Sequence, residues 1–133
     1  MQTGTTDALI DLAMEWGRMG NFLTKQGRGE EAGQYYQKFL EMSETIYQQT
    51  GTSKALELVI GALDKIGDNR YAIGLYDEAR THRLKAWELF EHYVNLDPSA
   101  ERLTKYFRDK AMQNGTSGII SSLKKILFKK RED

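Results

Sequence analysis

The chain of 133 residues has the length of one domain, and its 40% hydrophobic and 29% charged residues exclude wholesale disorder. Its 19 lysines and arginines balance its 19 aspartates and glutamates, so no basic excess points to nucleic acid. It contains no cysteine, which excludes disulfides, thiolate metal sites and cysteine nucleophiles. The N-terminus lacks the basic start and apolar run of a signal peptide, and no window approaches about 18 consecutive apolar residues. We therefore expect a cytoplasmic protein that does not bind nucleic acid.

Apolar residues recur every three or four positions along most of the chain, which is the spacing of one face of a helix. The pattern predicts helices over residues 9–26, 30–49, 54–71, 76–95 and 99–113. Gly27 and Gly29 end the first helix, and Ser53 is placed to cap the third. The single proline, Pro98, ends the fourth helix, because proline has no N–H and disfavours helix in the residue before it.

The four long helices are two copies of one unit. A shift of 47 residues places identical residues on one another, including the pairs Ala8 and Ala55, Leu9 and Leu56, Gly20 and Gly67, Gly27 and Gly74, Glu31 and Glu78, Ala32 and Ala79, Lys38 and Lys85, Glu41 and Glu88, and Glu44 and Glu91. The apolar positions also keep phase, because Trp16 meets Leu63 and Met19 meets Ile66. A period of about 20 to 50 residues indicates stacked units, none of which can bury its apolar face alone.

The two units share a spacing of small and apolar residues that matches a known signature. The first copy has Trp16, Met19, Gly20, Leu23, Gly27, Ala32, Tyr36 and Phe39, and the second has Leu63, Ile66, Gly67, Gly74, Ala79 and Ala86. The chain resembles the tetratricopeptide repeat (TPR) family, in its long-helix bacterial form with a period of about 47–48 residues. Leu96-Asp97-Pro98-Ser99 is similar to the family's link between units, and the resemblance covers residues 6–113. Arg70 and Arg83 depart from the pattern, since the family has tyrosine and an aromatic residue there.

The small residues of the signature allow two antiparallel helices to approach closely. Gly20 and Gly67 lack the Cβ that would block the partner helix, and alanines 32 and 79 supply a small facing surface. Gly27 and Gly74 stand at the turns, where a left-handed backbone is least strained for glycine.

The resemblance implies an all-α, TPR-like right-handed α-solenoid of antiparallel helical hairpins. We expect a TPR-like helical repeat domain over residues 1–115 and a basic amphipathic C-terminal helix or tail over 116–133. The domain comprises repeat 1 at about 6–49, repeat 2 at about 53–96 and a partial repeat 3 at about 99–115.

Residues that carry catalytic or metal chemistry are few. His82 and His92 lie ten residues apart on one predicted helix, about 15 Å by helical rise, which is too far for one metal. Asp64 and Asp68 share a helix face and can in principle act as acid and base, but solvated faces with lysines nearby are the favoured interpretation. We therefore expect no enzyme, no cofactor and no metal site.

Helical repeat proteins bind partners on a surface, usually the concave one formed by the first helix of each unit. The resemblance implies partner-binding residues at Arg18, Asn21, Lys25, Asp64, Lys65, Asp68 and Tyr71. The family's clamp for the terminal carboxylate of chaperone tails is matched only by Asn21, because Gly17, Lys65, Asp109 and Gln113 do not fit it. The mixed charge suits another polar peptide, or no peptide at all.

The C-terminal segment combines apolar and basic residues. Its apolar residues are Ile119, Ile120, Leu123, Ile126 and Leu127, and its lysines, which we expect to make the tail contacts, are Lys124, Lys125, Lys129 and Lys130. The last fifteen residues hold five basic and two acidic groups, net +3, whereas the preceding residues hold 14 and 17, net −3. The segment can cap the stack, contact an anionic membrane, or mediate self-association or partner binding.

These patterns predict a non-catalytic adaptor or scaffold that binds a protein segment on its concave face or assembles with itself. Homodimerisation is expected because two complete repeats fall below the three usually needed for stability. The alternative is a peripheral membrane protein anchored by its basic C-terminal segment.

Overall fold

The computed structural model describes residues 4–112, and these residues form helices and no strand. The helices are α1 (Gly4–Lys25), α2 (Gly29–Thr50), α3 (Ser53–Ala72), α4 (Tyr76–Leu96), the 3₁₀ helix η1 (Pro98–Leu103) and α5 (Thr104–Met112). The expected all-α class is confirmed for the described part of the chain. The four long helices occupy the predicted ranges, although α1 begins at Gly4 instead of Leu9.

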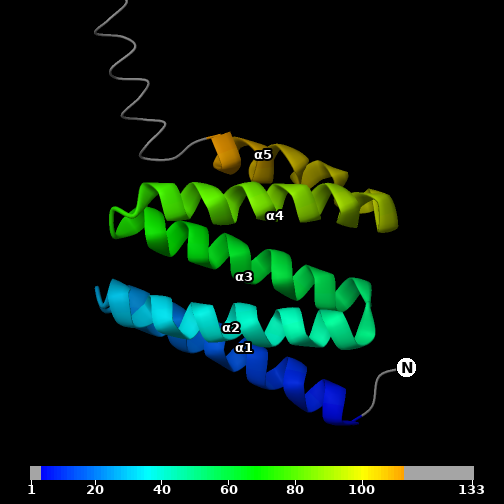
Figure 1. The fold of residues 1–133 in the computed structure, drawn as a ribbon, viewed down its shortest axis with the longest axis horizontal. Helices are drawn as coiled ribbons and strands as arrows, with labels where there is room; N and C mark the ends of the chain where they lie inside the picture. Colours follow the sequence, from blue (N-terminus) through cyan, green and yellow to red (C-terminus); the bar gives the residue numbers. More distant parts are fainter. Residues whose placement is uncertain (1–3, 113–133) are drawn as a thin grey trace, which may run out of the picture.

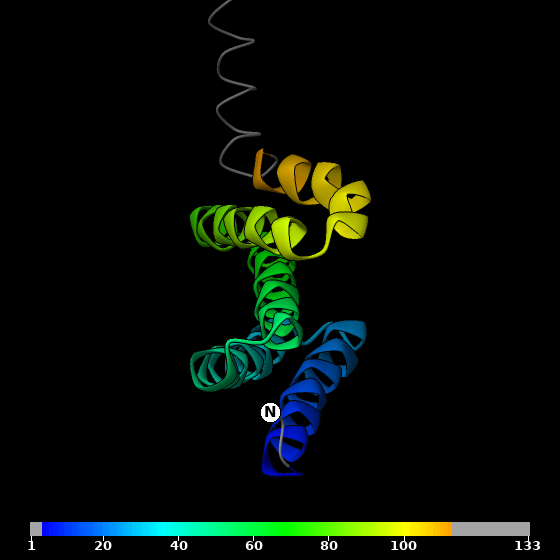
Figure 2. The same ribbon diagram turned by 90° about the vertical axis from the view of Figure 1, so that its right-hand side faces the viewer.

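Consecutive helices pack against one another in chain order, from α1 through α5 (Figure 1). Two or three residues connect each of the four long helices to the next, so neighbouring helices run antiparallel. In the end-on view of Figure 2, α2 and α4 lie on one side, α1 and α5 lie on the other, and α3 runs between them. The helices within the stack, α2, α3 and α4, therefore each pack against the element before and the element after them.

The turns within the two hairpins are built on glycine. Gly27 has φ 74° and Gly74 has φ 87°, both in the left-handed region that glycine adopts without strain. In each turn the following N–H reaches back into the helix: Arg28 N donates to Leu23 O at 3.0 Å, and Leu75 N donates to the carbonyl of residue 70 at 2.7 Å. The two turn glycines predicted from the repeat are confirmed.

The close approach of paired helices depends on Gly20 and Gly67. A Cβ built at Gly20 would lie 2.4 Å from the ring of Tyr36 on α2, and one at Gly67 would lie 2.7 Å from Cγ of Arg83 on α4. Ala32 and its repeat equivalent at position 79 are completely buried. The expected role of the small residues is therefore confirmed, with an aromatic ring as the neighbour in the first unit and an arginine in the second.

The core is centred on α3, which is packed on both sides. Leu56, Val59, Leu63 and Ile66 are each at most 2% exposed. Burial of one such side chain contributes about 1.5–3 kcal/mol. α3 thus has its apolar residues in contact with both hairpins and leaves a narrow polar strip for solvent.

Two local expectations are wrong. Thr52, rather than Ser53, caps α3, because the Thr52 side chain accepts the N–H of Ala55 at 3.1 Å. The segment predicted as one helix over 99–113 begins as the 3₁₀ helix η1, in which Asp97 Oδ1 accepts the N–H of Ser99 at 3.2 Å. η1 is a short segment that connects α4 to α5, and short connectors are a frequent use of the 3₁₀ helix.

The tail over 116–133, with Lys124, Lys125, Lys129 and Lys130, lies outside the described residues. Among the helices that are described, none combines the length and the apolar character needed to cross a membrane.

Gly20→Ala should destabilise the protein by about 1–3 kcal/mol, because the added methyl group would overlap the Tyr36 ring in a well-packed helix pair. The free energy of unfolding is measured by urea titration followed by circular dichroism.

The matched control is Gly61→Ala, since Gly61 also lies inside a helix but a Cβ there meets nothing within 4 Å. It should stabilise the protein by about 0.5–1 kcal/mol, through the higher helix propensity of alanine. Equal effects of the two substitutions would show that Gly20 is not needed for close packing.

Candidate functional site

A groove of about 670 Å³ lies between the end of α1, the start of α2 and the second half of α3. Its lining residues are Asn21, Thr24, Lys25, Gly27, Gly29, Tyr36, Lys65, Asp68, Asn69, Ala72 and Ile73. Four of the seven side chains predicted for the concave face line it, namely Asn21, Lys25, Lys65 and Asp68. The groove is open at the surface, and its walls come from both units of the repeat.

The first wall is organised by Tyr36. The hydroxyl of Tyr36 donates to Oδ1 of Asn21 at 2.7 Å. It also lies 3.1 Å from Oγ1 of Thr24, and the Thr24 hydroxyl donates to the carbonyl of Gly20 at 2.9 Å. Burial raises the pKa of Tyr36, against the opposing effect of the Thr24 hydrogen bond and with a smaller contribution from the charge of Asp68. The phenol therefore stays neutral at physiological pH and orients Asn21.

The second wall is organised by Asn69, which was not among the residues predicted for the concave face. This buried side chain donates from Nδ2 to the carbonyl of Gly29 at 2.8 Å, and its Oδ1 accepts from Nη1 of Arg70 at 2.6 Å. A Cβ at Gly33 would lie 2.7 Å from Oδ1 of Asn69. A glycine inside a predicted helix, near its start, was the one sequence signal for this close approach.

The charge of the groove is positive. Lys25 on α1 and Lys65 on α3 are both exposed, and within residues 4–112 neither forms an ion pair. Asp68 is 44% exposed at the side chain, but Arg83 Nη2 lies 3.0 Å and Lys110 Nζ lies 2.8 Å from its Oδ1. The one carboxylate of the groove is thus neutralised by cations on α4 and α5, whereas the two lysines keep their charge available.

Beside the groove, Lys110 of α5 crosses to α3. Its Nζ donates to Oδ1 of Asp64 at 3.2 Å, to Asp68 at 2.8 Å and to the hydroxyl of Tyr106 at 2.6 Å, while that hydroxyl donates to Oδ2 of Asp64 at 2.8 Å. Burial lowers the pKa of Lys110, but hydrogen bonds to Asp68 and Tyr106 and the charges of both aspartates outweigh it and raise the pKa. The two aspartates considered as an acid–base pair therefore share one cation.

The other three side chains predicted for the concave face, Asp64, Arg18 and Tyr71, lie outside the groove lining, and Asp64 belongs to the Lys110 cluster described above. Arg18 pairs with Glu15 on its own helix. Tyr71 packs edge-on against Tyr76 at 5.3 Å between ring centroids, with the guanidinium of Arg83 at 4.8 Å. All three side chains have intramolecular partners in this structure.

Residues 4–112 contain no group of three or more histidine, cysteine or acidic side chains that could hold a metal ion. No protein-family model matches the chain, and comparison with curated proteins and with solved structures gives no significant match. The function must therefore be inferred from the groove and from the internal repeat.

Lys110→Met should destabilise the protein by about 1–3 kcal/mol, because it removes charge-assisted hydrogen bonds and leaves Asp64 and Asp68 facing each other. Lys105→Met is the control, since that lysine is 76% exposed and pairs only within α5, where a pair is worth about 0.3–0.5 kcal/mol. Urea denaturation at neutral pH measures the free energy of unfolding of both variants and of the wild type.

The pH dependence follows from the raised pKa of Lys110. Its contribution is fully present below the unfolded-state pKa of about 10.4 and is lost as pH rises through the folded-state value. The stability difference between wild type and Lys110→Met should therefore stay constant from pH 7 to about pH 10 and shrink only above that range. A difference that already declines near pH 8 would contradict this assignment.

Proposed function

We propose that the chain is a TPR-type, non-catalytic adaptor or scaffold of the cytoplasm that binds an extended acidic peptide segment in the groove between α1 and α3. The repeat of 47 residues, the glycine turns at equivalent positions and the placement of the second helices of both units, α2 and α4, on one side (Figure 2) support a right-handed solenoid of the TPR kind. The absence of cysteine is consistent with a reducing compartment.

The observation that carries the proposal is that two lysines, which form no ion pair within the described residues, line a groove whose walls also present hydrogen-bonded polar side chains. Lys25 and Lys65 come from different helices, so a chain lying between them would meet positive charge on both sides. Asn21 uses its Oδ1 to accept from Tyr36, which leaves its Nδ2 to donate to a peptide carbonyl. Uncompensated lysines attract acidic partners at long range and select against basic ones.

Peptide display against the full-length protein tests the proposal. We expect enrichment of sequences rich in aspartate and glutamate, and weaker binding of the enriched peptides as salt rises, because the lysines are exposed. The Lys25→Glu/Lys65→Glu double variant should lose this binding by at least about tenfold, equivalent to about 1.4 kcal/mol.

Arg80→Glu is the matched control, since it reverses an exposed charge on α4 away from the groove. It should retain the affinity of the wild type for the enriched peptides. Selection of the same peptides by the double variant, or no enrichment by the wild type, would reject the groove as the binding site.

Self-association is a second candidate, favoured by the outer face of α1. Leu12 is 42%, Met19 43% and Phe22 54% exposed, and their spacing places them on one side of the helix. This face lies at the end of the stack, where no preceding helix covers it in the described part of the chain. A second copy that places its own α1 there would bury these side chains.

Leu12→Glu/Phe22→Glu should therefore convert a dimer into a monomer of 15.3 kDa, as measured by gel filtration with light scattering. The double variant should keep its helicity, because both side chains are exposed in the monomer. A monomeric wild type at high concentration would exclude this mode of assembly.

A further inference from the structure

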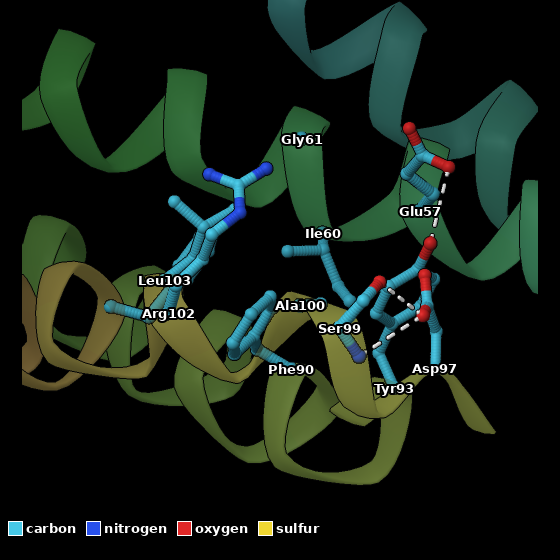
Figure 3. A pocket seen from close by; sticks show the side chains of 11 residues that line it. Glu57, Ile60, Gly61, Phe90, Tyr93, Asp97, Ser99, Ala100, Arg102 and Leu103 are labelled. Carbon is cyan, nitrogen blue, oxygen red and sulfur yellow. Dashed lines mark hydrogen bonds between the residues drawn. The ribbon is translucent and has the colours of Figure 1, made fainter. Parts of the chain in front are cut away.

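Figure 3 shows a second pocket, of about 380 Å³. It lies toward the start of α3, whereas the groove lies toward its end. It is formed by the start of α3, the end of α4, η1 and α5, with the lining residues Glu57, Ile60, Gly61, Phe90, Tyr93, Asp97, Ser99, Ala100, Arg102, Leu103 and Phe107. The proposed peptide-binding function uses none of these residues.

The floor of the pocket is apolar and closely packed. Ile60 and Phe90 are almost fully buried, and the rings of Phe90 and Phe107 stack with centroids 4.4 Å apart. Leu103 at the edge is 38% exposed although it is a large aliphatic side chain. An occupant with an aliphatic or aromatic side chain would remove this surface from water.

Two carboxylates stand on the rim. Glu57 accepts a hydrogen bond of 3.4 Å from the hydroxyl of Tyr93, and Asp97 accepts from the N–H and the hydroxyl of Ser99 at 3.2 and 2.6 Å (Figure 3). In the part of the chain that the structure describes, neither carboxylate forms an ion pair. Arg102 also lines the pocket, on the side away from Glu57 and Asp97 (Figure 3), so two carboxylates and one cation give the lining a net charge of −1. The pocket therefore suits a segment in which apolar residues are followed by cations that lie at the Glu57 and Asp97 side of the rim.

The chain itself contains such a segment close to the pocket. Residues 126–128 are Ile-Leu-Phe, residues 129–130 are two lysines, and the last fifteen residues carry net charge +3. We propose that this pocket binds the C-terminal segment 119–130 of the same molecule, with residues 126–128 against its apolar floor and Lys129 or Lys130 at its acidic rim.

The length of the connecting chain is sufficient. The helix α5 ends at Met112, and Phe107 in the pocket wall lies five residues earlier, about 7.5 Å along the helix axis. Residues 113–118 can span at most about 20 Å, so segment 119–130 can reach the pocket from the end of α5. Tethering by so short a chain gives an effective concentration of the order of mM, so modest contacts suffice for occupancy.

The absence of cysteine permits a direct test in the full chain, because a single Glu132→Cys substitution places one nitroxide spin label at the end of the segment. We expect the label to remove most of the NMR signal intensity of the Gly61 and Leu103 amides in the pocket. The amide of Ile73, at the other end of α3 and in the groove, should keep its intensity.

Gly61→Phe should abolish this broadening, since its Cβ meets no neighbour within 4 Å and its ring would fill the pocket. Gly61→Ala is the control that keeps the pocket open. Glu57→Lys should weaken the broadening, and Lys129→Glu/Lys130→Glu in that background should restore it. Circular dichroism verifies that each variant is folded.

Three results would overturn the proposal. The first is that the pocket amides keep their full intensity when the label is attached. Immobilisation of the label on phosphatidylserine vesicles would then show that the segment binds an anionic membrane instead. The second is broadening that persists in Gly61→Phe. The third is broadening seen only when a spin-labelled chain is mixed with an isotope-labelled one, because the segment would then bind a second copy.

Discussion

The contact between Gly20 and Tyr36 sets the geometry on which the rest of the first unit depends. Because Gly20 has no Cβ, the tyrosine ring can lie against α1 and bring α1 and α2 together. The same placement brings the tyrosine hydroxyl to Asn21 and Thr24, so the residue that closes the helix pair also builds one wall of the groove. Packing and surface chemistry are thus linked through one side chain.

The second unit keeps the close approach but changes its chemistry. Arg83 takes the place of the ring against Gly67, is 7% exposed, and pairs with Asp68 while its guanidinium lies over Tyr71. A buried cation is tolerated only when it is paired and hydrogen-bonded. This pairing, together with that of Lys110, neutralises Asp68 and leaves Lys25 and Lys65 to define the charge of the groove.

One face of α3 connects the two recesses of the molecule. The groove with its lysines occupies the end near Ile73, the pocket with its acidic rim occupies the end near Glu57, and the Lys110 cluster lies between them. The opposite charges of the two ends explain why an acidic peptide and a basic segment are assigned to different sites. Both recesses are lined by residues of α3, so this one helix sets their separation along the stack.

The sequence by itself determined the four long helices, the turns at Gly27 and Gly74 and the need for Gly20, because apolar periodicity and glycine conformation are local properties. The concave face implied by the resemblance included Asn21, Lys25, Lys65 and Asp68, which line the groove, but also three residues that do not line it, Arg18, Asp64 and Tyr71. Only the tertiary structure decided that Lys110 captures two aspartates more than 40 residues away and that Asn69 joins α3 to the start of α2. Such contacts depend on how far one helix is shifted along the axis of another, and no local pattern in the chain encodes that shift.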